Sequence, residues 1–373
     1  MLTAIALGLC PAAQAQTDTG GFSTGIGAPA DAIPINVSTL DELTRAVTNN
    51  AHRIVINGHI YGGPKLKTLT FSDNSWDNTT IEGASGGNAV LENIQLKFSG
   101  EKLSDGRNIS NIIIRDITFS GRISDLQALP PQVKGTSDDA GINYLGVSLR
   151  RVSNAWIDHC TFYDISDDLF SIGLSSDKIT VSYNHFYFSD NWLTMQPDPV
   201  WNWVGTYNDL AGERLAMLVG INKDDSYAYG GNALHVTIHH NWIGPNMRGR
   251  PLLRGWVHAY NNYFDNSTAP DGYNKGTDGK SYPTVQYNAL QIGSGSNVVS
   301  ESNYFYKTKN SNQIGLDADG DNYSFRERNN VYESTTGKSA TGTSFTGSPV
   351  KYTYKLDSAS SLSSLQKGST GPR

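Results

Sequence analysis

Apolar and polar residues alternate in a phrase of about eight residues that recurs along most of the chain and closes on an aromatic or aliphatic residue. The phrase occurs at Ile112–Phe119, Ala155–Phe162, Ile179–Phe186, Val236–Ile243, Val257–Phe264, Val298–Phe305 and Phe325–Tyr332. Successive copies start 43, 24, 57, 21, 41 and 27 residues apart, so single steps cluster between 21 and 27 residues. Short strands repeated at such a step predict a solenoid, in which each repeat forms one coil.

Asparagine occupies the sixth position in five of the seven copies. These residues are Asn184, Asn241, Asn262, Asn303 and Asn330. A residue repeated once per coil lies above its counterpart, and stacked amide groups can satisfy one another's donors and acceptors. We therefore predict an all-β parallel β-helix with a buried Asn ladder. The alternative, a β-propeller, needs blades of roughly 40 to 50 residues, which is longer than the shortest steps found here.

One helix and two long loops interrupt the strand pattern. The hydroxyl residues Ser38–Thr39 precede a helical period that lasts to about Asn49. We expect this helix to cap the open N-terminal edge of the solenoid. The segments Gly121–Leu145 and Tyr187–Tyr229 break the period and carry Pro, Asp and Trp residues. They are predicted to be long loops on one face, where binding sites gather.

Composition adds limits on location and partners. Residues 1–15 form an apolar run that ends in small residues, which resembles a secretory signal peptide, so the chain is expected to be secreted. No other apolar stretch approaches the roughly 20 residues of a membrane span, so no membrane partner is expected. The net charge of −6 argues against nucleic acid as a partner, because phosphate binding needs a basic face.

Three arginines lie within seven residues, between two copies of the repeated phrase. They are Arg248, Arg250 and Arg254, and the flanking strands are predicted to hold them rigidly. A rigid row of guanidinium groups suggests an anionic ligand, which must be bound locally because the chain as a whole is acidic. The alternative is a solvated run of surface charges.

Several ordered motifs together resemble the pectate lyase and pectin lyase superfamily of right-handed parallel β-helices. The motifs are Thr79–Gly83, Trp156–His159 (WIDH), Ile179–Asn184 (ITVSYN), Arg248–Asn262 and Gln291–Gly293. The resemblance covers roughly residues 35 to 335 and implies a secreted enzyme that cleaves homogalacturonan by β-elimination, with a pectic polysaccharide as its partner.

The expected organisation follows from this resemblance together with the composition. Residues 16–34 are predicted to be a flexible leader, and residues 35–356 the β-helix catalytic domain. Residues 357–373 are rich in Ser, Gly and Lys and are predicted to be a loose tail. A capped solenoid needs no second subunit, so we expect a monomer.

The resemblance also implies a calcium site, because a hard cation suits the carboxylate of a uronate sugar. In pectate lyases, an aspartate of the WIDH phrase and two acidic residues four apart on the next coil hold the metal. Asp158 matches the first position and Asp167 the second, whereas Ser171 stands at the third. We therefore expect a weakened Ca²⁺ site formed by Asp158 and Asp167.

The catalytic base of this family is an arginine, and flanking cations favour the loss of its proton. Counted from Gly255, the base position falls on Arg248. Counted from Pro251, it falls on Gly249, next to Arg250. We predict Arg248 as the base, with Arg250 as the alternative.

Two further arginines are assigned to substrate binding by the resemblance. Arg254 matches the arginine that binds a substrate carboxylate. The lysine that follows the SYN phrase in the family is absent, because Asp190–Asn191 stands there. Arg214 lies further along the chain and is expected to substitute for that lysine.

Three other functions stay open. A calcium-independent pectin lyase acting on methylated pectin would explain Ser171, although such enzymes place an arginine where this chain has Asp167. A polygalacturonan hydrolase would need paired carboxylates, for which Asp167–Asp168 is the nearest candidate. A non-catalytic, β-helical polysaccharide-binding protein would use the arginines for binding alone.

Overall fold

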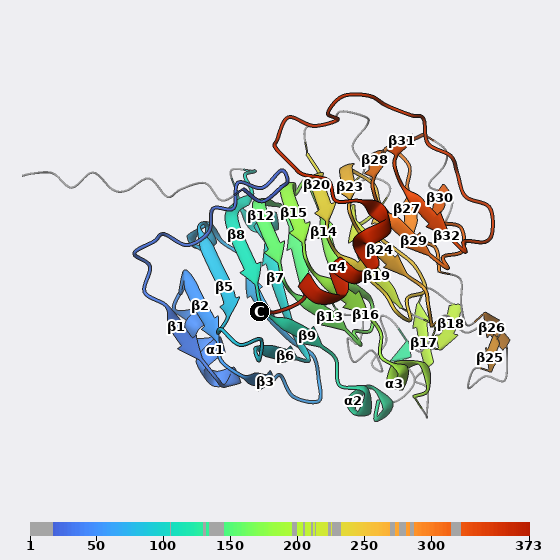
Figure 1. The fold of residues 1–373 in the computed structure, drawn as a ribbon. Helices are drawn as coiled ribbons and strands as arrows, with labels where there is room; N and C mark the ends of the chain where they lie inside the picture. The colour runs from blue at the N-terminus through green and yellow to red at the C-terminus, as the bar shows by residue number, and fades with distance from the viewer. Residues whose placement is uncertain are drawn as a thin grey trace, which may run out of the picture.

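The described part of the chain winds into stacked coils that run from the N-terminal end to the C-terminal end of the molecule (Figure 1). The computed structural model describes residues 18–104, 106–129, 132–133, 145–195, 200–203, 206–209, 212, 214–222, 225, 233–268, 273–275, 281–283, 287–314 and 322–373. The predicted signal peptide at residues 1–15 lies outside these ranges. No helix in the described residues is both long and apolar enough to cross a membrane.

Each coil contributes one strand to each of three parallel sheets, which have ten, nine and eight strands in the described part of the chain. The ten-stranded sheet contains β1 (Ile35–Val37), β2 (Arg53–Ile56), β5 (Thr79–Gly83), β8 (Ile109–Arg115), β12 (Val152–Asp158), β15 (Asp177–Ser182), β20 (His235–His239), β23 (Trp256–Tyr260), β28 (Asn297–Glu301) and β31 (Ser324–Arg328). The nine-stranded sheet contains β3 (His59–Tyr61), β6 (Val90–Glu92), β9 (Thr118–Ser120), β13 (Thr161–Tyr163), β16 (His185–Tyr187), β21 (Trp242–Ile243), β24 (Tyr263–Asp265), β29 (Tyr304–Tyr306) and β32 (Val331–Glu333).

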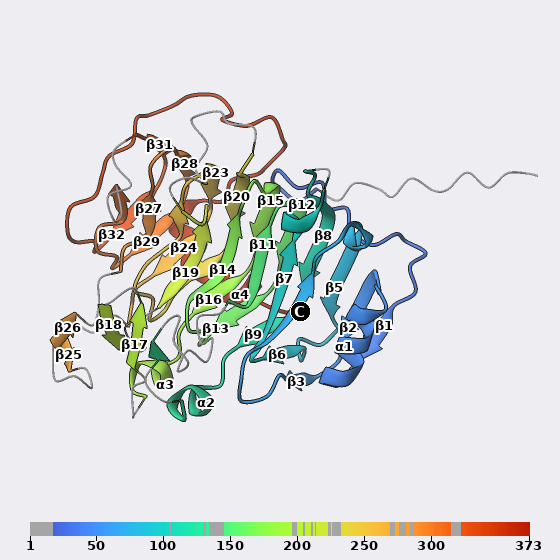
Figure 2. The same cartoon turned by 180° about the vertical axis from the view of Figure 1, so that it is seen from behind.

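The eight-stranded sheet closes the coil, and Figure 2 shows several of its strands side by side. It contains β4 (Lys67–Phe71), β7 (Ile94–Ser99), β11 (Val147–Arg150), β14 (Asp168–Gly173), β19 (Leu215–Val219), β22 (Leu252–Leu253), β27 (Leu290–Ile292) and β30 (Asn312–Ile314). The predicted right-handed parallel β-helix is confirmed. Its core lies between the three sheets, where buried rings stack from coil to coil; Phe162, for example, lies 4.9 Å from Phe119 and 5.0 Å from Phe186 between ring centroids.

The repeated phrase forms two short strands on two sheets, with a sharp corner between them. In the copy at Val257–Phe264, β23 ends at Tyr260, β24 begins at Tyr263, and Asn261 takes a φ of 51° at the corner. The left-handed conformation is uncommon outside glycine, yet Tyr183 and His240 adopt it at equivalent corners with φ of 52° each. The left-handed residue bends the chain sharply, so that it passes from the ten-stranded sheet to the nine-stranded sheet.

The predicted Asn ladder is confirmed and lies one residue after these corners. The amide Nδ2 of Asn184 donates to Oδ1 of Asn241, that of Asn241 to Asn262, and that of Asn262 to Asn303, at 3.0 Å each. Asn303 continues the row to Asn330 at 3.4 Å. The amides of Asn184, Asn241 and Asn262 also donate to backbone carbonyls, which keeps these buried groups satisfied.

The predicted N-terminal helix is α1 (Leu40–Thr48), and its hydroxyl cap is Thr39. The Thr39 side chain accepts from Glu42 N while the Glu42 side chain accepts from Thr39 N, which forms a capping box. Leu43 is fully buried, and α1 contacts β1 and β4. The other helices are α2 (Ile123–Gln127), α3 (Asp190–Leu193) and α4 (Leu362–Ser369).

The prediction of a loose tail at residues 357–373 is wrong. Residues 350–373, here called the C-terminal strap, include α4, which lies across the coils beside β24 (Figure 1). Leu362 and Gln366 are fully buried, and Gln366 Nε2 donates to Asn261 O at 2.7 Å. A few buried side chains among many Ser residues hold this segment, which composition alone does not reveal.

The leader also packs where a flexible segment was predicted. Its described residues 18–30, here called the N-terminal strap, run over the outer face of the ten-stranded sheet. Ser23 N donates to Thr180 Oγ1 at 2.9 Å, and Ala28 N donates to Thr80 Oγ1 at 2.9 Å. Threonine hydroxyls on separate coils, in β5 and β15, therefore bind the backbone of the strap.

The two segments that break the repeat meet each other. β10 (Gln132–Val133) comes from the first segment and pairs with β17 (Val200–Trp203) of the second, which pairs with β18 (Thr206–Asp209). A further hairpin joins β25 (Tyr273–Lys275) to β26 (Ser281–Pro283). Residues 134–144 of the first segment and 226–229 of the second are among those that lie outside the described ranges.

Candidate active site

The predicted arginines lie at the ends of two strands of the eight-stranded sheet, β19 and β22. Register fixes the outer face of this sheet, because parallel partners in one row point to the same side. One outward row runs through Ser148, Ser171, Leu218, Leu252 and Gln291. The rows beside it carry core residues such as Val147 and Leu149, so this row faces away from the core, although Ser148, Ser171, Leu252 and Gln291 are themselves buried.

Arg248 is exposed at the edge of this sheet, just before its strand begins. Its backbone N donates to Arg214 O at 2.8 Å, and the next residue, Gly249, forms parallel bridges with Leu215 and Asn288. Nη1 of Arg248 donates a hydrogen bond to Gly212 O at 3.4 Å. These bonds hold the backbone at Arg248 while its side chain is exposed, so the guanidinium can contact a polymer.

Arg250 is two residues further on and is bent back towards the sheet. Its φ of 76° places it in the left-handed region, between Gly249 and Pro251. This conformation carries the side chain to Asp168, where Nε lies 2.9 Å from Oδ1. The side chains of Arg250 and Asp168 are 15% and 4% exposed, so this ion pair is largely shielded from water.

The other two predicted substrate residues are mostly inside the protein. Arg214 is 1% exposed, which contradicts the expectation that its side chain replaces a substrate-binding lysine at the surface. Arg254 is 7% exposed and donates from Nη1 to Gly220 O at 2.8 Å. It follows β22, so Arg250 and Arg254 flank this strand at its two ends. Arg254 stays a predicted carboxylate-binding residue.

Asp167 lies in the turn that leads into β14. The same turn contains Asp164, which is buried and accepts from Ser189 N at 2.8 Å and Ser189 Oγ at 2.6 Å. Burial raises the pKa of the Asp164 carboxyl to about 6, even though both hydrogen bonds favour the charged form. Asp164 thus connects the turn to Ser189, the residue that caps α3.

Asp158 does not join this cluster. It ends β12 in the ten-stranded sheet, and β13 of the nine-stranded sheet separates it from the turn that holds Asp167. Its carboxylate accepts from Ser182 Oγ at 2.6 Å and lies 2.7 Å from His159 Nδ1. The expectation that Asp158 and Asp167 share one groove is therefore wrong, because they occupy different corners of the coil.

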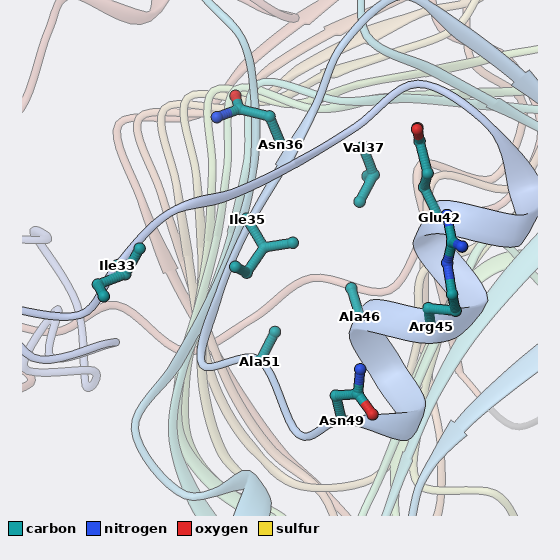
Figure 3. Close-up of a pocket in the computed structure, with 9 residues that line it drawn as sticks. All are labelled: Ile33, Ile35, Asn36, Val37, Glu42, Arg45, Ala46, Asn49 and Ala51. Carbon is teal, nitrogen blue, oxygen red and sulfur yellow. The ribbon is translucent and has the colours of Figure 1, made fainter.

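A separate hollow of 390 Å³ opens at the N-terminal end of the solenoid, between α1 and β1 (Figure 3). Ile35, Val37, Ala46 and Ala51 give it a largely apolar wall. It lies far along the axis from the arginine cluster and offers no row of cations. The outer face of the eight-stranded sheet is therefore the better candidate for the binding of an anionic polymer.

Comparison with known proteins agrees with the geometry. A family model described as pectate lyase matches residues 204–370. A pectate trisaccharide-lyase from Thermotoga sp. (strain RQ2) is 26% identical over 249 residues, which cover 66% of this chain and 54% of that protein. The chain is therefore similar in sequence to pectate lyases. It spans about half the length of the curated relatives that it matches first.

Solved structures of pectate lyases share the fold. Pectate lyase C from Erwinia chrysanthemi, solved with Ca²⁺, has a TM-score of 0.63 at 16% identity and covers 95% of this chain and 96% of its own. A pectate lyase from Bacillus sp. N165, solved with trigalacturonate, has a TM-score of 0.62 at 19% identity and covers 94% and 98%. Pectate lyases of this architecture have thus been solved in the presence of Ca²⁺ and in complex with trigalacturonate.

Within the described residues, the donor set does not fit the calcium site expected for a pectate lyase. Calcium takes six to eight oxygen ligands, several of them carboxylates. Asp158 lies on another sheet, Ser171 Oγ lies 3.2 Å from Ser148 Oγ, and Asp168 is paired with Arg250. Within the described ranges, no group of three or more His, Cys, Asp or Glu residues could hold a metal ion.

Asp168 is the site residue that the sequence did not identify. It was considered only as part of an acidic pair, whereas the structure pairs it with a guanidinium two strands away. The strand register is what places Asp168 near the arginines, because Asp168 pairs with Leu215 and Leu215 bridges to Gly249, the residue before Arg250. Counting rows from the repeated phrases would have placed Asp168 beside the arginines.

Proposed function

We propose that this protein is a secreted polysaccharide lyase that cleaves pectate by β-elimination, with Arg248 as the proton acceptor. The observation that carries the proposal is the exposed Arg248, two residues before the largely buried Arg250–Asp168 pair, in a parallel β-helix with the fold of pectate lyases. The trisaccharide-lyase and trigalacturonate complex among its relatives support a galacturonate polymer as the substrate.

The reaction needs one base and fixed positive charge. Arg248, in its unprotonated form, takes the proton from C5 of a uronate residue. The electron pair of the C5–H bond forms a double bond between C4 and C5, and the bond from C4 to the glycosidic oxygen breaks. That oxygen leaves and takes a proton from water. Negative charge that builds on the uronate carboxylate during proton removal is stabilised by nearby guanidinium groups.

Arg248 is favoured over Arg250 as the base. A base must reach the C5 proton of the substrate, and the side chain of Arg250 is only 15% exposed, with its Nε 2.9 Å from the carboxylate of Asp168. Arg248 is exposed, whereas Arg250 lies against the sheet. Arg248 therefore combines access to the substrate with neighbouring positive charge.

Calcium has a limited place in this proposal. Asp167 remains a candidate ligand together with the carboxylates of the substrate, and the bound ion would supply positive charge next to those carboxylates. Asp158 is not assigned to it, because its oxygens are used by Ser182 and His159 on the ten-stranded sheet. The steps above depend only on side chains of this chain.

The experiment is an ultraviolet assay of the purified protein on pectate and on methylated pectin, each with and without a chelator. Elimination creates a conjugated, absorbing product, whereas hydrolysis yields only reducing ends and simple binding yields neither. Absorbance that rises on pectate supports the proposal. Reducing ends without absorbance would instead indicate a hydrolase, and binding without either product would indicate a polysaccharide-binding protein.

A further inference from the structure

The N-terminal end of the solenoid has a free strand edge. β1 is the first strand of the ten-stranded sheet and pairs, within the described part of the chain, only with β2. Val37 O accepts from Asn57 N at 2.8 Å, so Val37 faces β2, and the backbone N–H and C=O of the preceding residue, Asn36, face the open side. Figures 1 and 2 both show β1 at the outer end of the molecule. A row of unpaired backbone groups is a template for a further strand.

Exposed apolar side chains lie at the same edge. Among the described residues, five large hydrophobic side chains are exposed, and two of them, Ile33 at 79% and Ile35 at 41%, lie on β1 or just before it. Both line the hollow of 390 Å³ between β1 and α1, together with Val37 and Ala46 (Figure 3). Protruding apolar side chains therefore lie beside an apolar hollow, which is typical of an association surface.

A second copy of this chain supplies a partner for both features. Two β1 strands can run antiparallel about a two-fold axis at Asn36, where each Asn36 N–H donates to the Asn36 C=O of the other copy. This register places Ile35 opposite Val37 of the second copy and Ile33 opposite Thr39, the N-cap of α1. The isoleucines of each copy then point into the hollow of the other, so one surface provides both the protruding side chains and the space that receives them.

Charges near the contact are also complementary. Arg45 lines the hollow and is exposed, and Asp31, also exposed, lies two residues before Ile33. The antiparallel register brings Asp31 of one copy to the first turn of α1 in the other, about one helical turn from Arg45. Asp41 lies on that first turn and offsets part of the attraction, so the apolar contact contributes most.

We propose that the protein forms a two-fold dimer in which the β1 strands of two copies join their ten-stranded sheets, and Ile33 and Ile35 of each copy pack into the hollow of the other. The dimer takes the place of the monomer expected from the sequence, because β1 has an unpaired edge although α1 lies at the same end of the solenoid. A two-fold contact uses both free edges, so association ends at two chains. The strands are short, and the interface belongs to the class below about 1,200 Å² that dissociates on dilution.

The dimer is independent of the proposed lyase function. The predicted arginines lie at the ends of β19 and β22, several coils along the solenoid from β1. Each chain therefore keeps its own candidate site, and the activity per chain should be the same in the monomer and in the dimer.

The first test measures the mass of the protein in solution against its concentration by sedimentation velocity. Ile33→Glu/Ile35→Glu puts charge into the apolar contact. Asn36→Pro removes the N–H on the open side and no backbone bond to β2. Leu365→Glu is the matched control, because Leu365 is also an exposed large hydrophobic residue, at 42%, but lies on α4.

We expect the unchanged protein and Leu365→Glu to pass from the mass of one chain to that of two chains between about 1 and 100 µM, the range of a weak interface. The other two variants should stay at the mass of one chain and keep the urea midpoint and the activity of the unchanged protein. A single chain at every concentration, assemblies larger than two chains, or a dimer that persists in Ile33→Glu/Ile35→Glu would each overturn the proposal.

A cross-link tests the register and does not depend on whether the other variants weaken the fold. Asn36→Cys is made in a Cys10→Ser background, which leaves only the buried Cys160 as a further thiol. Opposite residues of a hydrogen-bonded antiparallel pair have Cα atoms about 5.5 Å apart, within the range of a disulfide. Oxidation should therefore link two chains of Asn36→Cys and leave Leu365→Cys largely unlinked on a non-reducing gel. Equal linkage of the two variants would contradict an antiparallel contact at Asn36.

Discussion

The outer faces of the eight-stranded and ten-stranded sheets carry polar and charged residues in similar rows, yet they differ in what covers them. On the eight-stranded sheet, Arg248 is exposed, whereas the Arg250–Asp168 pair two residues further on is largely buried. On the ten-stranded sheet, the N-terminal and C-terminal straps lie over the rows. There, His239 Nε2 binds Thr19 O at 2.7 Å and His258 Nδ1 binds Tyr352 OH at 2.6 Å.

This difference shows that a recognisable motif and a reactive site need not coincide. The WIDH phrase is one of the clearest motifs of the chain, but its Asp158 is 2% exposed and its oxygens are occupied. Such a group contributes to packing of the coils. The arginine run is less regular as a motif, yet it lies where a polymer can reach it.

Arg248→Ala should have the largest effect. Loss of a proton acceptor typically costs 100- to 10,000-fold, so we expect kcat on pectate to fall about a thousandfold with the unfolding free energy nearly unchanged. Steady-state kinetics and urea unfolding measure the two quantities. Arg45→Ala, at an exposed position of α1, is the control. Activity retained within a few-fold would remove Arg248 from the base role.

Asp164→Asn should change how the unfolding free energy of the protein depends on pH. The folded pKa of about 6 lies above the ordinary value of 3.8, so the contribution of Asp164 is present below pH 4 and is lost as pH rises through 6. The ionised group then costs roughly 3 kcal/mol at pH 7. The variant should be more stable by up to about that amount at pH 7 and unchanged near pH 3.5. Urea unfolding at both pH values checks this, and equal shifts at both would contradict it.

Leu362→Ala tests whether the C-terminal strap is part of the folded structure. Leu362 is fully buried beside Tyr263 and Tyr304, so its truncation should cost about 2 to 3 kcal/mol of unfolding free energy. Leu365→Ala is the matched control, because Leu365 is 42% exposed on the same helix and should change stability by less than about 0.5 kcal/mol. Similar small losses in both variants would mean that the strap contributes little.

Asp158→Asn should have the smallest effect on catalysis. The change weakens the contacts with Ser182 and His159 and should cost about 1 to 2 kcal/mol of stability. We expect kcat/KM on pectate to stay within about twofold. A tenfold loss that added calcium restores would place Asp158 in the site after all and would blur the distinction between the two faces.

Much of the fold could be predicted because its signals repeat. The seven copies of one phrase predicted the coils, and the Asn at a fixed position in five of them predicted the ladder. The straps could not be predicted in this way, because they occur once and are rich in Ser, Thr and Gly. Their order depends on a few contacts, such as Gln366 with Asn261, between residues far apart in the sequence.

The site was only partly predictable for a related reason. The arginine run locates it, but the partner of Arg250 depends on register across two strands and on one left-handed residue. The burial of Arg214 depends on the strands on either side of it. A motif match carries neither kind of information, and it placed Asp158 in a metal site that the geometry does not form.

The row of amides from Asn184 to Asn330 also bears on how the molecule comes apart. Each amide is completed by the next coil, so the loss of one leaves a donor in one turn and an acceptor in its neighbour without a partner. Disruption of one coil therefore destabilises the coils on either side of it, and unfolding that starts in one coil should spread along the axis of the solenoid. The solenoid is expected to unfold as a linked whole even though each turn touches only the turns beside it.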